Sequence, residues 1–149
     1  MHAGSHLVLK TVGAIAQGEV STHVQPQSKE LKTAYKLHND NTKIDWTASR
    51  SSIFNHIRGL SPYPGSWCTL RNGEKEERVK IYGASIPIEN EIEEKKGEIG
   101  SIHIDAGHLY ILTIDGYLEM VEIQLPGKRK MEVNALLNGY KFAENSKMC

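Results

Sequence analysis

Apolar residues recur at a helical spacing near the start of the chain. Between residues 5 and 17, the positions that share one predicted helix face are Leu7, Val8, Val12 and Ile15. Gly18 follows the last of them, and glycine is typical of the position just after a helix. A single helix cannot bury such a face by itself, so we expect it to pack against another part of a protein.

A second helix is predicted where the chain becomes apolar again. It begins near Thr47-Ala48-Ser49, whose hydroxyl groups can cap a helix, and it runs to about Arg58. Its apolar face consists of Ile53, Phe54 and Ile57. Gly59 ends it, and the prolines within residues 61–65 exclude regular structure because each fixes its own φ angle and restricts its predecessor.

From Trp67 onward, short apolar runs alternate with turn residues, which is typical of β-strands. The dipeptide Asn72-Gly73 predicts a hairpin. The strands expected from this pattern cover residues 66–71, 76–85, 97–104, 108–114 and 117–125. A last short helix is expected over residues 131–137. The pattern predicts a mainly β fold with flanking helices, in which about five to six short strands form a small, closed or partly closed OB-like barrel.

The stretch from Gly18 to Thr42 has little apolar content and no sustained period, which predicts a linker that crosses a surface. The basic residues of this stretch and its end are Lys29, Lys32, Lys36 and Lys43. The whole chain of 149 residues has 18 basic and 18 acidic residues and a formal net charge of zero. Any nucleic-acid site must therefore be a local basic cluster that acidic residues balance elsewhere.

Composition and spacing exclude several other classes of protein. Apolar residues make up 39% and charged residues 24%, as in an ordinary globular protein. No apolar run reaches the roughly 18 residues of a membrane span, and residues 1–11 lack a signal-peptide pattern, so we expect a cytoplasmic protein. Cys68 and Cys149 have no metal-ligand spacing, and the seven histidines include no H-E-x-x-H pair, so no metal site is expected.

Four short motifs follow one another along the chain. Ile44-Asp45-Trp46 is the first, and Ile57–Trp67, with the sequence IRGLSPYPGSW, is the second. Lys80-Ile81-Tyr82 is the third. The fourth joins Gln124–Met131, with the sequence QLPGKRKM, to Leu136–Gly139, with the sequence LLNG. Their order and spacing resemble the C-terminal half of the methionyl-tRNA formyltransferases, over nearly the whole chain.

The resemblance implies a two-domain parent enzyme. In this family an N-terminal Rossmann-like domain binds the co-substrate 10-formyltetrahydrofolate and formylates the methionine of charged initiator tRNA. A linker then leads to an OB-like domain that helps to hold the tRNA. We therefore expect residues 1–18 to be a remnant last helix of the catalytic domain, 19–43 a basic linker, and 44–149 the OB-like tRNA-binding domain.

The resemblance also implies what the chain lacks. The family's catalytic Asn, His and Asp and its folate-binding loop lie upstream of the matched region, so no residue here inherits those roles. We expect no catalytic residue and no cofactor in this chain, and no formyl transfer by this chain alone. Its expected partners are initiator methionyl-tRNA and the missing catalytic domain, with no membrane and no metal.

The densest basic cluster is Lys128-Arg129-Lys130, between the last predicted strand and the last predicted helix. The plain interpretation is a solvated turn. The resemblance favours RNA contact instead, because the cluster corresponds to a basic motif of the family. Arginine suits bidentate contact with phosphate, and lysine supplies a point charge.

The linker lysines Lys32, Lys36 and Lys43 are further RNA-binding candidates, because the family's linker faces the tRNA. The alternative is that they keep the linker soluble and extended. Arg58 is also a candidate, although a cation at a helix C-terminus has a structural role of its own through the helix dipole. The aromatic residues near it are interpreted as packing residues rather than base-stacking platforms: Trp46, Tyr63 and Trp67.

The sequence thus predicts the C-terminal part of a methionyl-tRNA formyltransferase, which binds tRNA weakly, through phosphates, and without reading sequence. One alternative is a free-standing OB-like RNA-binding module. Another is the equivalent domain of a different folate-dependent formyltransferase. The basic linker and Lys128-Arg129-Lys130 favour the tRNA enzyme, because a small substrate does not need a distant basic surface.

Overall fold

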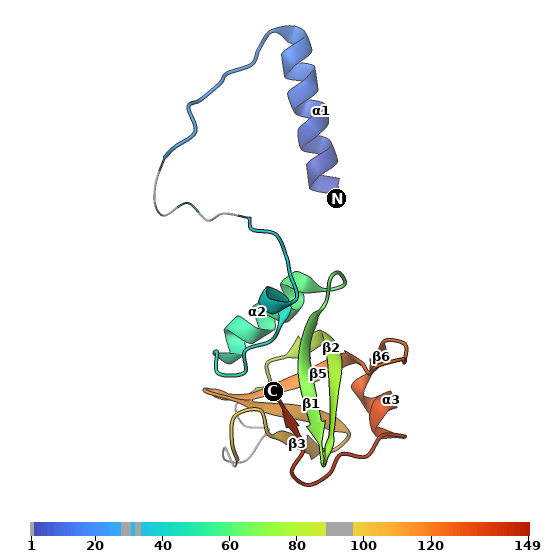
Figure 1. The fold of residues 1–149 in the computed structure, drawn as a ribbon. Helices are drawn as coiled ribbons and strands as arrows, with labels where there is room; N and C mark the ends of the chain where they lie inside the picture. Colours follow the sequence, from blue (N-terminus) through green and yellow to red (C-terminus); the bar gives the residue numbers. More distant parts are fainter. Residues whose placement is uncertain (1, 28–30, 32–33, 89–96) are drawn as a thin grey trace. The chain divides into compact units, whose positions relative to one another are not determined.

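The computed structural model describes residues 2–27, 31, 34–88 and 97–149 of the chain. These residues form two compact units, Met1–Tyr35 and Lys36–Cys149 (Figure 1). None of the helices within the described ranges is long and apolar enough to cross a membrane. The domain boundaries predicted at residues 18 and 43 stay a prediction.

The first unit contains α1 (His2–Gln17), which confirms the helix predicted there. Gly18 follows it with a φ of +72°, in the left-handed region that favours glycine. The N–H of Gly18 donates to the carbonyl of Ile15 at 3.1 Å, and the N–H of Glu19 donates to that of Ala14 at 3.0 Å. These two bonds close the helix as a Schellman motif. The apolar side chains of α1 are more than half exposed: Leu7, Val8, Leu9, Val12 and Ile15.

In the second unit, α2 (Arg50–Leu60) confirms the other predicted helix. Ser49 caps it, since its hydroxyl oxygen accepts from the N–H of Ser52 at 3.3 Å. The first N–H group of the helix, that of Arg50, donates to Oδ1 of Asp115 at 2.8 Å. The residues that α2 buries are Ile53, Ile57 and Leu60. A 3-10 turn, Asp40–Thr42, precedes this helix.

The sheet is antiparallel, with the strand order β3-β4-β5-β2-β1-β7, and β6 pairs separately with β5. The strands are β1 (Ser66–Asn72), β2 (Lys75–Ser85), β3 (Ile102–Asp105), β4 (His108–Thr113), β5 (Gly116–Gln124), β6 (Met131–Glu132) and β7 (Lys147–Met148). The short helix α3 (Val133–Leu137) follows β6. This arrangement confirms the mainly β fold with flanking helices (Figure 1).

The two edges of the sheet meet without forming a ladder. Ser101, just before β3, forms an isolated antiparallel bridge with Lys147 of β7. The N–H of Met148 donates to the carbonyl of Gly100 at 2.8 Å. Gly100 has a φ of +88°, and a Cβ there would collide with the carbonyl oxygen of Met148, so both its conformation and this close approach require glycine. The sheet is therefore not closed into a continuous barrel, and its two edges touch at this bridge.

Three details of the sequence prediction were wrong. The strand expected over residues 97–104 is confined to β3, because its first part is a turn in which the N–H of Ser101 donates to the carbonyl of Glu98 at 2.9 Å. The helix expected over residues 131–137 starts as β6 and becomes helical only at Val133. The strand β7 was missed, since two residues are too few to show a periodic pattern.

A single main core fills the inside of the sheet. Its fully buried side chains include Cys68, Leu70, Val79, Ile81, Leu109, Ile111, Leu118 and Ile123. The side chains of α2 and α3 close this core, together with Ile44, Trp46 and Met148. Trp46 is 4% exposed, which confirms its interpretation as a packing residue. Tyr63 is 89% exposed, so the same interpretation was wrong for Tyr63.

Candidate nucleic-acid interface

The face of the sheet that points away from the core carries basic and aromatic side chains on β1 and β2. Burial alternates along both strands, so Cys68 and Val79 point inward while their neighbours point outward. The register pairs Trp67 of β1 with Lys80 of β2, and Lys80 in turn with Gln124 of β5. One row of side chains therefore crosses three strands on this outer face.

Trp67 anchors one end of this row. Its Nε1–H donates to the carbonyl of Asn39 at 2.7 Å, and its own carbonyl accepts from the N–H of Ile44 at 2.8 Å. Two cations lie over its ring: Cζ of Arg78 is 3.9 Å from the ring centroid, and Nζ of Lys43 is 5.6 Å away. Arg78 also donates from Nη2 to Oδ1 of Asn39 at 3.0 Å. Trp67 thus attaches the start of the second unit to the sheet and gathers two cations beside it.

The other end of the row reaches the turn between β5 and β6. Nζ of Lys80 donates to the carbonyl of Pro64 at 3.0 Å. The hydroxyl of Tyr82 donates to Oε1 of Gln124 at 2.9 Å, and Nε2 of Gln124 donates to the carbonyl of Lys128 at 2.9 Å. Lys130 lies 5.5 Å from the Tyr82 ring centroid. A continuous set of contacts therefore links β2 to the Lys128-Arg129-Lys130 turn.

The described ion pairs between lysine or arginine and a carboxylate leave several cations of this outer face without an acidic partner. They are Arg50–Asp115, Arg71–Glu76, Lys75–Glu77, Lys130–Glu122 and Lys147–Glu98, with N to O distances between 2.7 and 3.8 Å. Within the described ranges, no carboxylate lies within ion-pair distance of Lys43, Arg78 or Lys80, and the same holds for Lys128 and Arg129. These cations without a carboxylate partner form a local basic cluster on a chain of zero net charge.

We call the following residues the basic face: Lys43, Arg78, Lys80, Lys128, Arg129 and Lys130. Four of them are sequence candidates, and the structure brings Lys43 and the Lys128-Arg129-Lys130 turn to the two ends of the Trp67–Lys80–Gln124 row. All four are exposed. Their role in RNA binding stays a prediction.

The other three candidates lie apart from this row. Lys36 is exposed, and its carbonyl accepts from Nδ2 of Asn41 at 2.9 Å, which places its backbone beside the turn that holds Trp67. Arg58 donates to Oδ1 of Asn55 at 3.0 Å and lies 5.9 Å from the Phe54 ring, and both partners belong to its own helix. Lys32 lies outside the described residues.

Arg78, Lys80 and Tyr82 were missed by sequence reasoning as site residues. A signal was present, because the three occupy alternate positions of one predicted strand and must share a face. The pattern alone does not say that Trp67 and Asn39 lie beside them. Those contacts join residues up to 39 positions apart in the chain.

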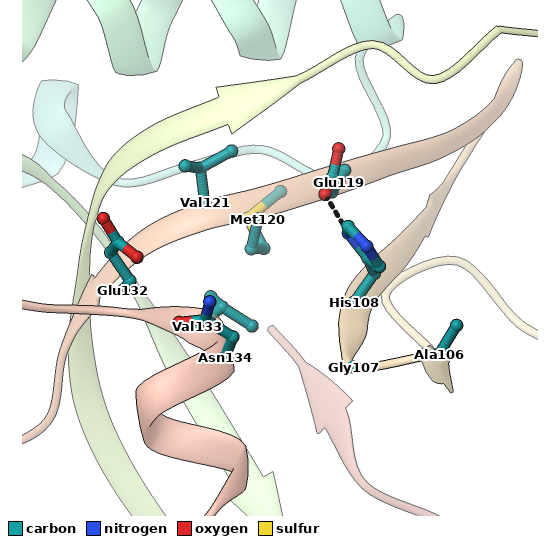
Figure 2. Close-up of a pocket in the computed structure, with 9 residues that line it drawn as sticks. All are labelled: Ala106, Gly107, His108, Glu119, Met120, Val121, Glu132, Val133 and Asn134. Carbon is teal, nitrogen blue, oxygen red and sulfur yellow. Dashed lines mark hydrogen bonds and ion pairs between the residues drawn. The ribbon is translucent and has the colours of Figure 1, made fainter.

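A pocket of about 280 Å³ lies between the β4–β5 hairpin and the start of α3 (Figure 2). Nδ1 of His108 and Oε1 of Glu119 are 2.6 Å apart at its wall. The remaining lining residues are Ala106, Gly107, Met120, Val121, Glu132, Val133 and Asn134, which include no hydroxyl, thiol or amine nucleophile. No group of three His, Cys, Asp or Glu residues suited to a metal ion occurs among the described residues. His108 and Glu119 thus form a polar pair at the wall of the pocket, and Glu132 adds a second carboxylate to the lining.

Comparisons with known proteins agree with the four sequence motifs. The family model for the formyl transferase C-terminal domain matches residues 36–141. A methionyl-tRNA formyltransferase from Flavobacterium johnsoniae is 40% identical over 149 residues, covering 99% of this chain and 46% of the relative. Relatives of the same name from Flavobacterium psychrophilum and Bartonella bacilliformis are 40% and 36% identical, covering 97% and 93% of this chain and 44% and 42% of those relatives.

The chain thus spans less than half the length of these curated relatives. A crystal structure of a HypX variant from Aquifex aeolicus is 20% identical, with a TM-score of 0.55, and the match covers 91% of this chain and 24% of that one. At this identity the likeness shows the fold alone. The match of the family model over most of the chain shows the family: this chain belongs to the formyl transferase C-terminal domain family.

Proposed function

We propose that this chain is the tRNA-holding part of a methionyl-tRNA formyltransferase and that its basic face contacts RNA phosphates. The observation that carries the proposal is the gathering of Lys43, Arg78 and Lys80 on one outer face, where no described carboxylate neutralises them. A local cluster of this kind is what a chain of zero net charge needs in order to bind a polyanion.

The mode of binding follows from the chemistry of the face. Lysine and arginine heads are suited to phosphate oxygens, and A-form RNA exposes phosphates while its deep groove hides the base edges from side chains. Contacts of this kind set position and orientation without reading sequence. The basic face therefore holds the tRNA weakly and by shape, while discrimination of the initiator tRNA belongs to other contacts.

Formyl transfer is assigned to other parts of the parent enzyme. We propose that 10-formyltetrahydrofolate is bound by a catalytic domain, because the family's catalytic and folate-binding residues have no counterpart in this chain. The relatives' name, methionyl-tRNA formyltransferase, supports tRNA as the substrate of that enzyme. It also favours this function over a free-standing RNA-binding module and over a formyltransferase acting on a small molecule.

The test is tRNA binding by two variants with equal changes in net charge. The first carries Lys43→Gln, Lys128→Gln and Arg129→Gln, all exposed members of the basic face. The control carries Arg71→Gln, Lys75→Gln and Lys147→Gln, whose side chains are ion-paired. If each basic-face residue contacts one phosphate, the slope of log affinity against log salt should fall by about 0.7–0.9 per residue in the first variant.

The control should keep the slope of the parent chain, measured by fluorescence anisotropy with labelled initiator tRNA. Equal losses in the two variants would show that only total charge matters, and would contradict a localised binding face. Absence of binding by the parent chain at low salt would contradict the proposed function itself.

A further inference from the structure

We infer that Arg78 forms a phosphodiester-binding subsite within the basic face, with its guanidinium held in place by Trp67 and Asn39. The inference rests on the proposed function, because it names one RNA contact of that face. It goes further in assigning a specific geometry to a residue that the sequence motifs did not single out.

Arg78 is held by two contacts at once. Its Cζ lies 3.9 Å from the centroid of the Trp67 ring, and its Nη2 donates to Oδ1 of Asn39 at 3.0 Å. A guanidinium carries five N–H donors, and the contact with Asn39 uses one of them. Contact with an aromatic ring involves the flat surface of the guanidinium and leaves the N–H donors at its edge available to acceptors. Arg78 is exposed, so its remaining donors are accessible to a phosphate.

Both supports of Arg78 depend on Asn39. The carbonyl of Asn39 accepts from Nε1–H of Trp67 at 2.7 Å, while its side-chain oxygen accepts from Arg78. Thr42 fixes the same turn, because its hydroxyl donates to the carbonyls of His38 at 3.0 Å and Asn39 at 3.1 Å. A side chain fixed in this way loses less conformational freedom when it binds a ligand, which favours binding.

Arg71 on the same sheet shows the opposite arrangement. Its Nε and Nη2 both lie 2.8 Å from Oε1 of Glu76, so an internal carboxylate already occupies the edge of its guanidinium. Among the described residues, Arg78 has no such carboxylate partner. The two arginines lie on adjacent, paired strands, yet only Arg78 leaves its edge open to an external anion. The ligand that fits is a phosphodiester group of bound RNA.

The test compares Arg78→Gln, Arg78→Lys and the control Arg71→Gln for binding of initiator tRNA over a series of salt concentrations. Arg78→Gln should weaken binding about 5- to 20-fold at low salt and lower the salt slope by about 0.7–0.9, the loss of one phosphate contact. Arg78→Lys should keep the slope of the parent chain, because the charge remains, but it should still bind more weakly, because lysine cannot donate two parallel hydrogen bonds. Arg71→Gln should change neither quantity.

The outcomes separate this inference from the function on which it rests. If the parent chain binds tRNA and Arg78→Gln keeps its affinity and slope, the subsite is overturned while the proposed function stands. If the parent chain does not bind, both are overturned. Should Arg78→Gln fail to fold, as judged by circular dichroism, Arg78→Lys decides alone, and affinity equal to that of the parent would overturn the positioned subsite.

Discussion

At the scale of single residues, the dipeptides Asn72-Gly73 and Asn138-Gly139 show that the contribution of an asparagine to stability depends on its neighbours in the fold. Asn72 ends β1, and the four hydrogen bonds of its side chain hold the segment from Tyr140 to Ser146. Its Nδ2 donates to the Tyr140 hydroxyl and the Lys141 carbonyl, and its Oδ1 accepts from Ala143 N–H and the Ser146 hydroxyl. Asn138 is exposed and caps α3 through its backbone.

Asn72→Ala should therefore destabilise the fold by about 2–3 kcal/mol, because it removes four hydrogen bonds and leaves partly buried groups unpaired. Asn138→Ala also removes an asparagine side chain that precedes a glycine, but it should lower the free energy of unfolding by less than about 0.5 kcal/mol. Urea unfolding followed by circular dichroism measures both. Equal losses would show that the Asn72 contacts do not hold the C-terminal segment.

At this scale, the sequence predicted one part of the candidate site and missed another. The Lys128-Arg129-Lys130 cluster is visible in the sequence because its members are adjacent. Arg78 cannot be identified in this way, because its position in the site depends on contacts with Trp67 on the paired strand and with Asn39 in another segment. Sequence spacing shows which residues share a strand face, but it does not show which distant residues that face meets.

At the scale of elements, the helices and the long strands followed from local rules. Ser49 caps α2 and Gly18 closes α1 where the sequence places a capping residue and a stop signal. The hairpin predicted from Asn72-Gly73 formed, although its two loop residues are Gly73, at a φ of +62°, and Glu74. The strands β6 and β7 could not be predicted, because each has two residues and forms only through pairing with distant strands.

The link between α2 and the β4–β5 turn should make stability depend on pH. Partial desolvation raises the pKa of Asp115. Hydrogen bonds from the Arg50 N–H and the Thr113 hydroxyl, together with the charge of Arg50, lower it by more, so the pKa lies below its ordinary value of 3.8. The ionised form therefore stabilises the fold above about pH 4, and this contribution is lost as pH falls through the folded pKa.

Asp115→Asn should accordingly lower the free energy of unfolding at pH 7 by roughly 0.5–1 kcal/mol, a modest value because the carboxylate is 45% exposed and screened. At pH 2.5 the difference between the variant and the parent chain should shrink. Urea unfolding at both pH values measures this. A difference that is the same at pH 2.5 and pH 7 would contradict the charged link.

At the scale of the whole molecule, the central claim is that a chain without net charge binds RNA through one face. Among the described residues, Lys43, Arg78, Lys80, Lys128 and Arg129 have no carboxylate partner, whereas Lys130 pairs with Glu122. The family resemblance supports tRNA as the proposed partner, and the pairing of β1, β2 and β5 brings the side chains of the basic face together. Neither source alone predicts where the RNA lies.

Lysine footprinting by mass spectrometry tests this claim most directly. The chain is treated with an acetylating reagent with and without initiator tRNA, and the modification of each lysine is quantified. We predict that tRNA protects Lys43 and Lys128, while Lys75 and Lys141, which are exposed away from the basic face, keep their reactivity. Protection of Lys75 and Lys141 with continued reactivity of Lys43 and Lys128 would contradict the account.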